Sequence, residues 1–151
     1  GSSFHLWLPL SDQQAAAATS PTGTLSTGHG LVLLVDDEPT VGLVGQRVLK
    51  SLGYETIVAH RGPEALVVFG QLHDRLAMVI CDVLMPGLSG PDTLRQMRAV
   101  DPSVPVALCS GYPDEHVGPI QAEGVTDVLV KPYKREELAS LLERRARTPP
   151  K

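Results

Sequence analysis

The chain has 151 residues and a mass of 16.1 kDa, the size of one ordinary globular domain. Hydrophobic residues make up 42% of it and charged residues 20%, which argues against a wholly disordered chain. The formal net charge is -4 and no basic run is present, so a nucleic-acid-binding surface is not expected. The sequence also lacks a secretory signal pattern and an apolar run of roughly 18 residues, which a membrane helix would need. We therefore expect a cytoplasmic chain that contacts neither nucleic acid nor membrane.

The composition changes near residue 30. Residues 1–30 contain no Lys or Arg and a single acidic residue, Asp12. Residues 11–30 are rich in Ala, Ser, Thr and Gly, so they bury too little to form a core and are predicted to be a flexible linker. Residues 1–10 include an alternating apolar segment that has the pattern of one isolated strand. The compact domain is expected to span residues 31–148.

Five short apolar runs follow the linker and are predicted to be strands. They are Leu31–Val35, Glu55–Ala59, Ala77–Cys81, Val104–Cys109 and Asp127–Val130. Three of them are nearly continuous in Val, Leu, Ile and Cys, which is typical of strands buried on both faces of a parallel sheet.

Segments with helical spacing lie between the strands. Their apolar stripes are Val41, Val44, Val48 and Leu52 in the first, Ala65, Phe69 and Leu72 in the second, and Leu138, Leu141 and Leu142 in the last. A further helix, Pro113 to Glu123, is interrupted by Gly118-Pro119 and is expected to be short, kinked or mobile. Strands that alternate with helices in this way predict a doubly wound, parallel α/β fold.

Cysteine and histidine residues give no sign of a metal or redox site. Cys81 and Cys109 lie in apolar runs without metal-ligand spacing, so they are expected to be buried thiols in a reducing compartment, even if adjacent strands bring them near each other. The five histidines have no paired spacing and are expected at the surface. They are His5, His29, His60, His73 and His116.

Polar side chains follow four of the predicted strands. They are Asp36, Asp37 and Glu38 after the first strand, Asp82 after the third, Ser110 after the fourth and Lys131 after the fifth. The strands of a parallel sheet all point the same way, so these residues should gather at its carboxyl edge, where open α/β sheets bind ligands. A carboxylate cluster of this kind suits Mg²⁺, and a lysine and a hydroxyl beside it suit phosphoryl oxygens. The combination is what phosphoryl transfer to an aspartate requires.

These residues resemble a known family. Asp36-Asp37, Asp82 followed by Met85-Pro86-Gly87 and Gly90, Ser110-Gly111 and Lys131-Pro132 are similar to the receiver domain of two-component response regulators. The resemblance covers about residues 31–147. It implies a flavodoxin-like five-stranded parallel sheet with strand order 2-1-3-4-5 and five helices.

The resemblance also implies a role for each matching residue. Asp82 would be the phosphoacceptor, which takes the phosphoryl group of a donor histidine. Asp36 and Asp37 would hold Mg²⁺ (or Mn²⁺) together with Asp82 and the backbone carbonyl of Leu84.

Two further residues complete the implied machinery. Lys131 would pair with the acceptor carboxylate and then with the phosphoryl group, and Ser110 would donate a hydrogen bond to a phosphoryl oxygen. The peptide bond between Lys131 and Pro132 is expected to be cis.

Structural roles are the alternative for each of these residues. Asp36 and Glu38 could cap the first helix, since carboxylates complement a helix N-terminus; we expect this of Glu38 and only partly of Asp36. Lys131 could be a surface lysine and Asp82 a turn residue. A turn aspartate would not explain why Lys131 and Ser110 are predicted at the same edge.

The chain departs from the family pattern at three places. Val128 stands where receivers often have an aromatic switch residue, three positions before the lysine. The bulky residues Leu84 and Tyr112 flank the acceptor position, which predicts slow self-dephosphorylation because they could exclude the attacking water. The interrupted fourth helix puts in doubt a dimer built on helix four, strand five and helix five.

Residues 1–10 include Gly1-Ser2-Ser3-Phe4 and Leu8-Pro9 and resemble the last strand of a histidine-kinase ATP-binding domain, so the chain is expected to be the C-terminal receiver of a hybrid sensor kinase. The alternative is that these residues are an ordinary leader. As a kinase receiver, the chain would be a phosphoacceptor domain rather than a turnover enzyme. Its expected partners are a histidine kinase phosphodonor domain and a histidine phosphotransfer protein, and its parent could be anchored in a membrane. The chain ends soon after the last helix, which favours relay over direct control of transcription.

Three alternative functions compete with this prediction. The first is a stand-alone response regulator that acts as a phosphorylation-gated protein-binding module. The second is an aspartyl phosphohydrolase, which the position of Leu84 disfavours because that chemistry needs an acid there. The third is a degenerate receiver, which the presence of every chemical residue disfavours.

Overall fold

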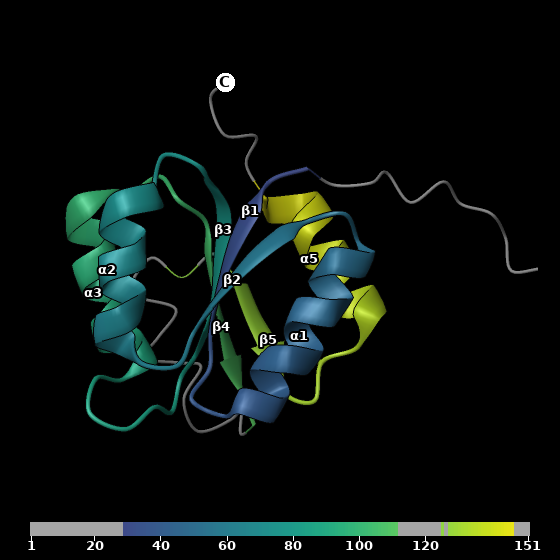
Figure 1. Cartoon of the computed structure of the whole chain (residues 1–151), viewed down its shortest axis with the longest axis horizontal. Coiled ribbons are helices and arrows are strands. Elements are labelled where there is room, and N and C mark those ends of the chain that lie inside the picture. The colour runs from purple at the N-terminus through teal and green to yellow at the C-terminus, as the bar shows by residue number, and fades with distance from the viewer. Residues whose placement is uncertain (1–28, 112–124, 126, 147–151) are drawn as a thin grey trace, which may run out of the picture.

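A parallel five-stranded sheet with the order β2-β1-β3-β4-β5 forms the centre of the molecule (Figure 1). The computed structural model describes residues 29–111, 125 and 127–146. The elements are β1 (Leu31–Val35), α1 (Pro39–Ser51), β2 (Glu55–Ala59), α2 (Gly62–Leu72), β3 (Leu76–Asp82), α3 (Gly90–Val100), β4 (Val106–Ser110), β5 (Asp127–Val130) and α5 (Arg135–Arg145). The predicted doubly wound fold and its strand order are confirmed.

Several predictions concern residues outside these ranges. They are the strand-like segment 1–10, almost all of the linker 11–30, the helix Pro113–Glu123 and the side chain of Tyr112. They stay predictions, as does the domain boundary near residue 148.

The sheet separates two apolar cores. Figure 1 shows α2 and α3 on one face of the sheet and α1 and α5 on the other. One core contains Phe69, Leu94 and Met97 from α2 and α3, and the other contains Leu49 and Leu138 from α1 and α5. All seven residues of β3 are buried, because this strand lies in the middle of the sheet with helices over both faces. The acceptor candidate Asp82 is therefore the last residue of a fully buried strand.

The predicted apolar stripe of α1 is confirmed at Leu52, which is buried, and at Val48, which packs against the core, but was wrong at Val44. The helix turns Gly42, Gly45 and Leu49 toward the sheet, whereas the side chain of Val44 is 53% exposed. The reason is close packing: a Cβ atom built on Gly45 would lie 2.7 Å from Cδ2 of Leu34. Hydrophobic periodicity overlooks such contacts, because glycine adds no apolar side chain to the stripe.

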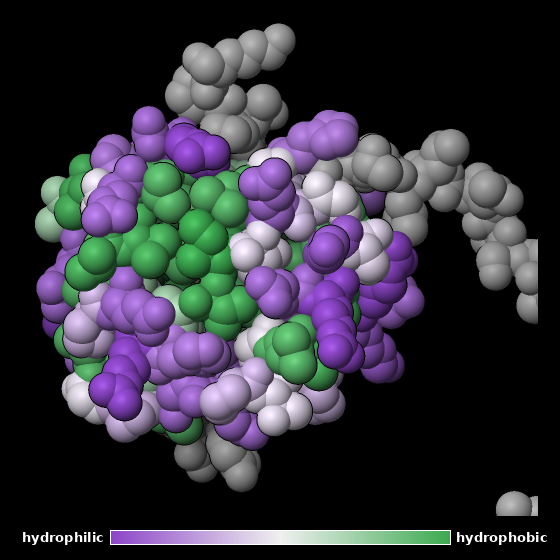
Figure 2. Space-filling view, viewed as in Figure 1, coloured by the Kyte–Doolittle hydropathy of each residue, from purple (hydrophilic) through white to green (hydrophobic). Residues whose placement is uncertain are grey.

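The other stripes agree better with the structure. Leu138, Leu141 and Leu142 are buried in α5 as predicted, and so are Ala65 and Phe69 in α2. The second helix is apolar on its outer side as well, since the side chain of Val67 is 62% exposed. Figure 2 accordingly shows an apolar patch over α2 and the part of the sheet beside it.

Candidate functional site

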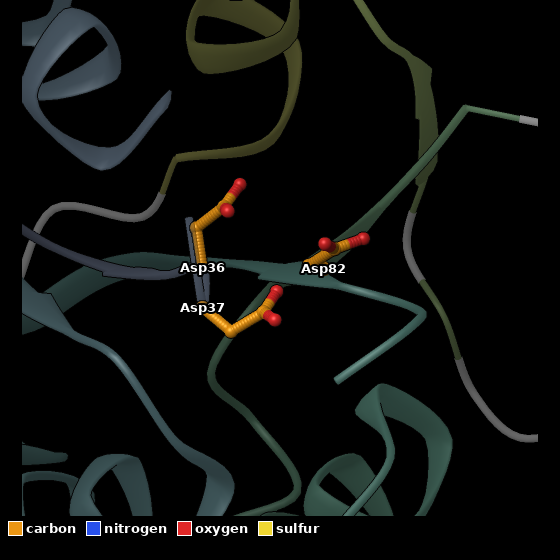
Figure 3. Close-up of side chains that lie close together, drawn as sticks. All are labelled: Asp36, Asp37 and Asp82. Carbon is orange, nitrogen blue, oxygen red and sulfur yellow. The ribbon is translucent and has the colours of Figure 1, made fainter. Parts of the chain in front are cut away.

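Three carboxylates lie together at the carboxyl edge of the sheet. Asp36 and Asp37 follow β1 directly, and Asp82 ends the neighbouring strand β3 (Figure 3). One carboxylate oxygen from each of the three lies within 4.8 Å of the others. The side chains of Asp36 and Asp82 are buried and that of Asp37 is exposed, so the cluster opens to solvent on one side. The sequence prediction that these residues converge is confirmed by their geometry.

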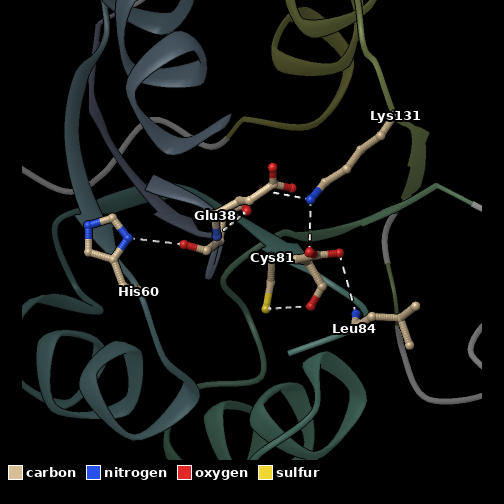
Figure 4. A network of polar contacts seen from close by, with 7 residues as sticks. Glu38, His60, Cys81, Leu84 and Lys131 are labelled. Atoms are coloured by element: carbon tan, nitrogen blue, oxygen red, sulfur yellow. Dashed lines mark hydrogen bonds and ion pairs between the residues drawn. The ribbon is translucent and has the colours of Figure 1, made fainter. Parts of the chain in front are cut away.

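Lys131 places a positive charge between two of these carboxylates. Its Nζ atom lies 2.7 Å from Oδ2 of Asp36 and 2.8 Å from Oδ2 of Asp82 (Figure 4). Burial by itself lowers the pKa of the lysine, but the hydrogen bonds and the charges of the two aspartates outweigh it and raise that pKa above its usual value. Lys131 is therefore charged at neutral pH and offsets part of the repulsion between the carboxylates. It is not the solvated surface lysine of the structural alternative.

The turn after β1 is held by Asp36 and not by Glu38. Oδ1 of Asp36 accepts a hydrogen bond of 3.0 Å from the backbone N–H of Glu38. Glu38 occupies the N-cap position of α1, but its side chain makes no capping hydrogen bond. The expectation that the Glu38 carboxylate caps the helix was wrong, and the short Asp36 side chain instead bonds the backbone of the turn that precedes the helix.

Ser110 and Leu84 stand at the same edge. Ser110 ends β4, is buried, and its carbonyl accepts a hydrogen bond of 2.9 Å from the backbone N–H of Lys131. Leu84 is 53% exposed, and its backbone N–H donates to Oδ1 of Asp82 over 3.4 Å. The peptide bond between Lys131 and Pro132 is cis, as predicted.

The sequence analysis missed a contact made by His60. This residue directly follows β2, and its Nδ1 atom lies 3.1 Å from the carbonyl oxygen of Asp36 (Figure 4). The rule that identified Asp36 and Lys131, polar residues at the ends of parallel strands, would also have found His60. A search for paired histidines does not detect it, because no second histidine stands at ligand spacing from His60. Of the other described histidines, His29 is exposed and His73 pairs with Asp101 over 3.2 Å.

The two cysteines are buried as predicted. Burial raises the pKa of both thiols well above the usual value. They lie on the adjacent strands β3 and β4, but Cys81 belongs to the core beneath α2 and α3 and Cys109 to the core beneath α1 and α5. The sheet itself therefore keeps the two sulfur atoms apart.

The donor set fits a small, hard divalent cation. Carboxylate oxygens are the ligands that Mg²⁺ prefers, and two or three of them beside open solvent leave room for the water molecules that it retains. Among the described residues, this is also the one group of three or more metal-ligating side chains that lie within reach of one ion. Cysteine sulfur is absent from the group, which disfavours a softer metal.

The sequence matches the family model of the response regulator receiver domain over residues 32–143. The chain belongs to the response regulator receiver family. Among its relatives, the sensor kinase CckA of Brucella abortus is 32% identical over 150 residues, which cover 93% of this chain and 16% of that protein. This chain thus corresponds to a small part of that kinase. Receivers of this family bind Mg²⁺ at their acidic site and act with histidine kinases in two-component signalling.

Two solved receiver structures show the same fold. The receiver domain of the sensor histidine kinase PA1611 from Pseudomonas aeruginosa, solved with a magnesium ion coordinated in its active-site cleft, is 28% identical with a TM-score of 0.72. The match covers 78% of this chain and 98% of that one. The receiver domain of the hybrid histidine kinase CckA is 34% identical with a TM-score of 0.67, over 78% of this chain and all of that one.

Within the described part of the receiver, no helix has the length and apolar character that crossing a bilayer requires.

Proposed function

We propose that this receiver takes a phosphoryl group from the phosphohistidine of a sensor kinase onto Asp82 and passes it along a phosphorelay. The observation that carries the proposal is the double contact of Lys131 with Asp36 and Asp82. A lysine held between two carboxylates neutralises charge where a phosphoryl group would add more, which is the electrostatic requirement of the reaction.

The chemistry follows from the positions of the side chains. A carboxylate oxygen of Asp82 forms a bond to phosphorus while the bond from phosphorus to the imidazole nitrogen of the donor breaks, and the donor leaves as histidine. The phosphoryl group then carries its negative charge beside the ammonium group of Lys131. Ser110, at the end of the next strand, is proposed to donate its hydroxyl hydrogen to a phosphoryl oxygen.

Asp36, Asp37, Asp82 and the backbone carbonyl of Leu84 are proposed to hold Mg²⁺. The close approach of the three carboxylates supports this assignment. When bound, the ion supplies positive charge for the phosphoryl oxygens. Mn²⁺, which also accepts oxygen ligands, is the alternative cation.

A hybrid sensor kinase is the proposed parent of the chain. The similarity to the sensor kinase CckA covers 93% of the chain, more than the receiver residues 32–143, so it extends into the segment before residue 32. That segment contains residues 1–10, which resemble a kinase strand. In such a protein, residues 11–30 tether the receiver and raise the local concentration of acceptor around donor. The alternative, a stand-alone receiver, lacks comparable support.

A groove beside Lys131 is proposed to receive the donor domain. It has a volume of about 380 Å³ and is lined by Val41, Val44, Pro132 and Tyr133 together with Glu38, Thr40 and Lys131. Because α1 turns its glycine face toward the sheet, Val44 lies at this surface. We expect Val44→Glu to slow transfer from a kinase at least tenfold while uptake from acetyl phosphate stays unchanged.

The direct test is uptake of a phosphoryl group. The chain is incubated with acetyl phosphate and Mg²⁺, and its intact mass is compared with that of the Asp82→Asn variant. One added phosphoryl group on the wild type and none on the variant is the expected result. Uptake by both proteins would assign the acceptor elsewhere. No uptake together with no Mg²⁺ binding would overturn the proposal.

A further inference from the structure

Asp36 is held by four separate contacts. Its backbone N–H donates to the carbonyl of Ala59 over 3.0 Å, and its carboxylate accepts from Glu38 and Lys131. Its own carbonyl lies 3.1 Å from Nδ1 of His60. Both backbone groups of Asp36 are therefore fixed by the end of β2, one by the main chain and one by a side chain.

The position of the Asp37 carboxylate depends on this backbone more than the positions of the Asp36 and Asp82 carboxylates do. Its side chain is exposed, and within the described residues no hydrogen bond or ion pair is formed by its carboxylate. The carbonyl of Asp36 belongs to the peptide unit that joins Asp36 to Asp37. Because a peptide unit is planar, the contact that fixes this carbonyl also fixes the N–H and the Cα atom of Asp37, the atom from which its side chain departs.

The imidazole of His60 is itself well placed for this role. Its backbone N–H donates to Oε2 of Glu64 over 2.8 Å, which anchors the residue at the start of α2. A Cβ atom built on Gly42 would lie 3.7 Å from Cε1 of the ring, so the imidazole lies alongside α1 where that helix carries no side chain. A carbonyl oxygen can only accept, which means that Nδ1 carries the hydrogen in this contact.

We propose that His60 is a positioning residue of the metal site: its Nδ1–H holds the Asp36–Asp37 peptide in the orientation that brings the Asp37 carboxylate to the cation. This inference rests on the proposed function, because it assumes that the carboxylate cluster binds Mg²⁺. A residue that orients a metal ligand contributes to metal affinity although it does not touch the metal. Its removal therefore weakens metal binding.

The test compares Mg²⁺ dissociation constants by calorimetry on the full chain after its metal has been removed with EDTA. His60→Ala and His60→Leu both remove the donor, and the leucine keeps the volume of the ring. His60→Asn keeps an N–H donor, since its amide nitrogen occupies nearly the place of Nδ1. The matched control is His73→Ala, which removes a histidine contact with Asp101 away from the cluster.

We expect both donor-free variants to raise the dissociation constant about three- to tenfold, the effect of one hydrogen bond. His60→Asn and His73→Ala should stay within about twofold of the wild type. Unfolding in urea, followed in EDTA, separates this effect from a general loss of stability. A variant that is merely less stable would still bind Mg²⁺ normally at a temperature where it is folded.

A further variant, Asp37→Asn, distinguishes the two possible failures. If the wild type binds no Mg²⁺, or Asp37→Asn binds it as tightly as the wild type does, the proposed metal site is wrong and the role of His60 falls with it. If Asp37→Asn loses binding while the donor-free variants keep it, only the role of His60 is overturned. If His60→Asn and His60→Ala weaken Mg²⁺ binding equally, the inference is also contradicted, because the asparagine keeps the N–H donor.

Discussion

Lys131 and Asp36 are 95 positions apart in the sequence, yet the lysine Nζ lies 2.7 Å from a carboxylate oxygen of the aspartate, whose side chain is 2% exposed. Both groups are largely removed from water, so each depends on the other for its charge to be stabilised. The same ammonium group also contacts Asp82.

Lys131→Met should therefore have two opposite effects. Without Mg²⁺, we expect the free energy of unfolding to fall by about 3 kcal/mol, because two carboxylates lose their shared counter-charge. Mg²⁺ should bind the variant more tightly than the wild type, since it no longer competes with the lysine, and should restore part of the lost stability. Urea unfolding with and without Mg²⁺ measures both effects. Weaker Mg²⁺ binding by the variant would contradict this account.

Gly90 and Gly70 provide a matched pair of helix glycines. A Cβ atom on Gly90 would collide with the carbonyl oxygen of Asp82 and lie 2.9 Å from Cα of Val83, whereas one on Gly70 would meet nothing within 4 Å. Gly90→Ala is expected to lower the free energy of unfolding by about 2–3 kcal/mol and to weaken Mg²⁺ binding. Gly70→Ala should raise the free energy of unfolding by about 0.5–1 kcal/mol, because alanine favours the helical conformation more than glycine does. A similar outcome for the two variants would show that the collision is relieved cheaply.

The buried thiols predict a loss of stability at alkaline pH. Burial raises the pKa of Cys81 and Cys109, so both stay protonated in the folded chain, whereas in the unfolded chain they lose their protons near pH 8.5. Above that pH the unfolded state binds fewer protons than the folded state, and the free energy of unfolding falls as pH rises.

At pH 9.5 the expected loss is about 1.4 kcal/mol for each thiol. The raised pKa values of Tyr54, Tyr133 and Lys131 add losses of the same sign, which become large only above about pH 10, where unfolded tyrosine and lysine titrate. Urea unfolding between pH 8 and 9.5 therefore isolates the cysteines. The control is the double variant Cys81→Ala, Cys109→Ala, in which the slope over this interval should disappear.

Leu84 allows the predicted slow self-dephosphorylation of Asp82 to be tested directly. The leucine stands two positions after the acceptor and is 53% exposed, so it can be replaced with a change in stability of less than about 0.5 kcal/mol. Leu84→Asn should shorten the lifetime of the phosphorylated chain about tenfold, because an amide can orient the attacking water where the leucine excludes it. Intact-mass decay after removal of acetyl phosphate measures the lifetime. An unchanged decay would contradict the proposed role of Leu84 in excluding water.

Much of the site was predictable because it follows from strand direction alone. Asp36, Asp82, Ser110 and Lys131 each stand at the end of an apolar run, and parallel strands bring such ends to one edge. The strands themselves were found to within two residues at each end, because runs of Val, Leu and Ile bounded by polar residues are distinctive.

The features that escaped prediction depend on packing between elements. The orientation of α1 is set by the contact of Gly45 with Leu34, and no hydrophobic pattern records such a contact. The role of His60 required knowledge of which carbonyl lies beside its ring. The assignment of the helix cap to Glu38 failed because its position and charge do not show whether its side chain bonds the helix backbone, and it does not.

The strand order limits how recombination can transfer this domain from one protein to another. The charges of the site come from the ends of β1, β3 and β5, and β3 lies between β1 and β4 in space although β2 separates β1 from β3 in the sequence. No contiguous fragment shorter than residues 36–131 contains both partners of the Lys131–Asp36 pair. Recombination can therefore join the module to new neighbours at either end, but a break anywhere inside it separates charges that act only together.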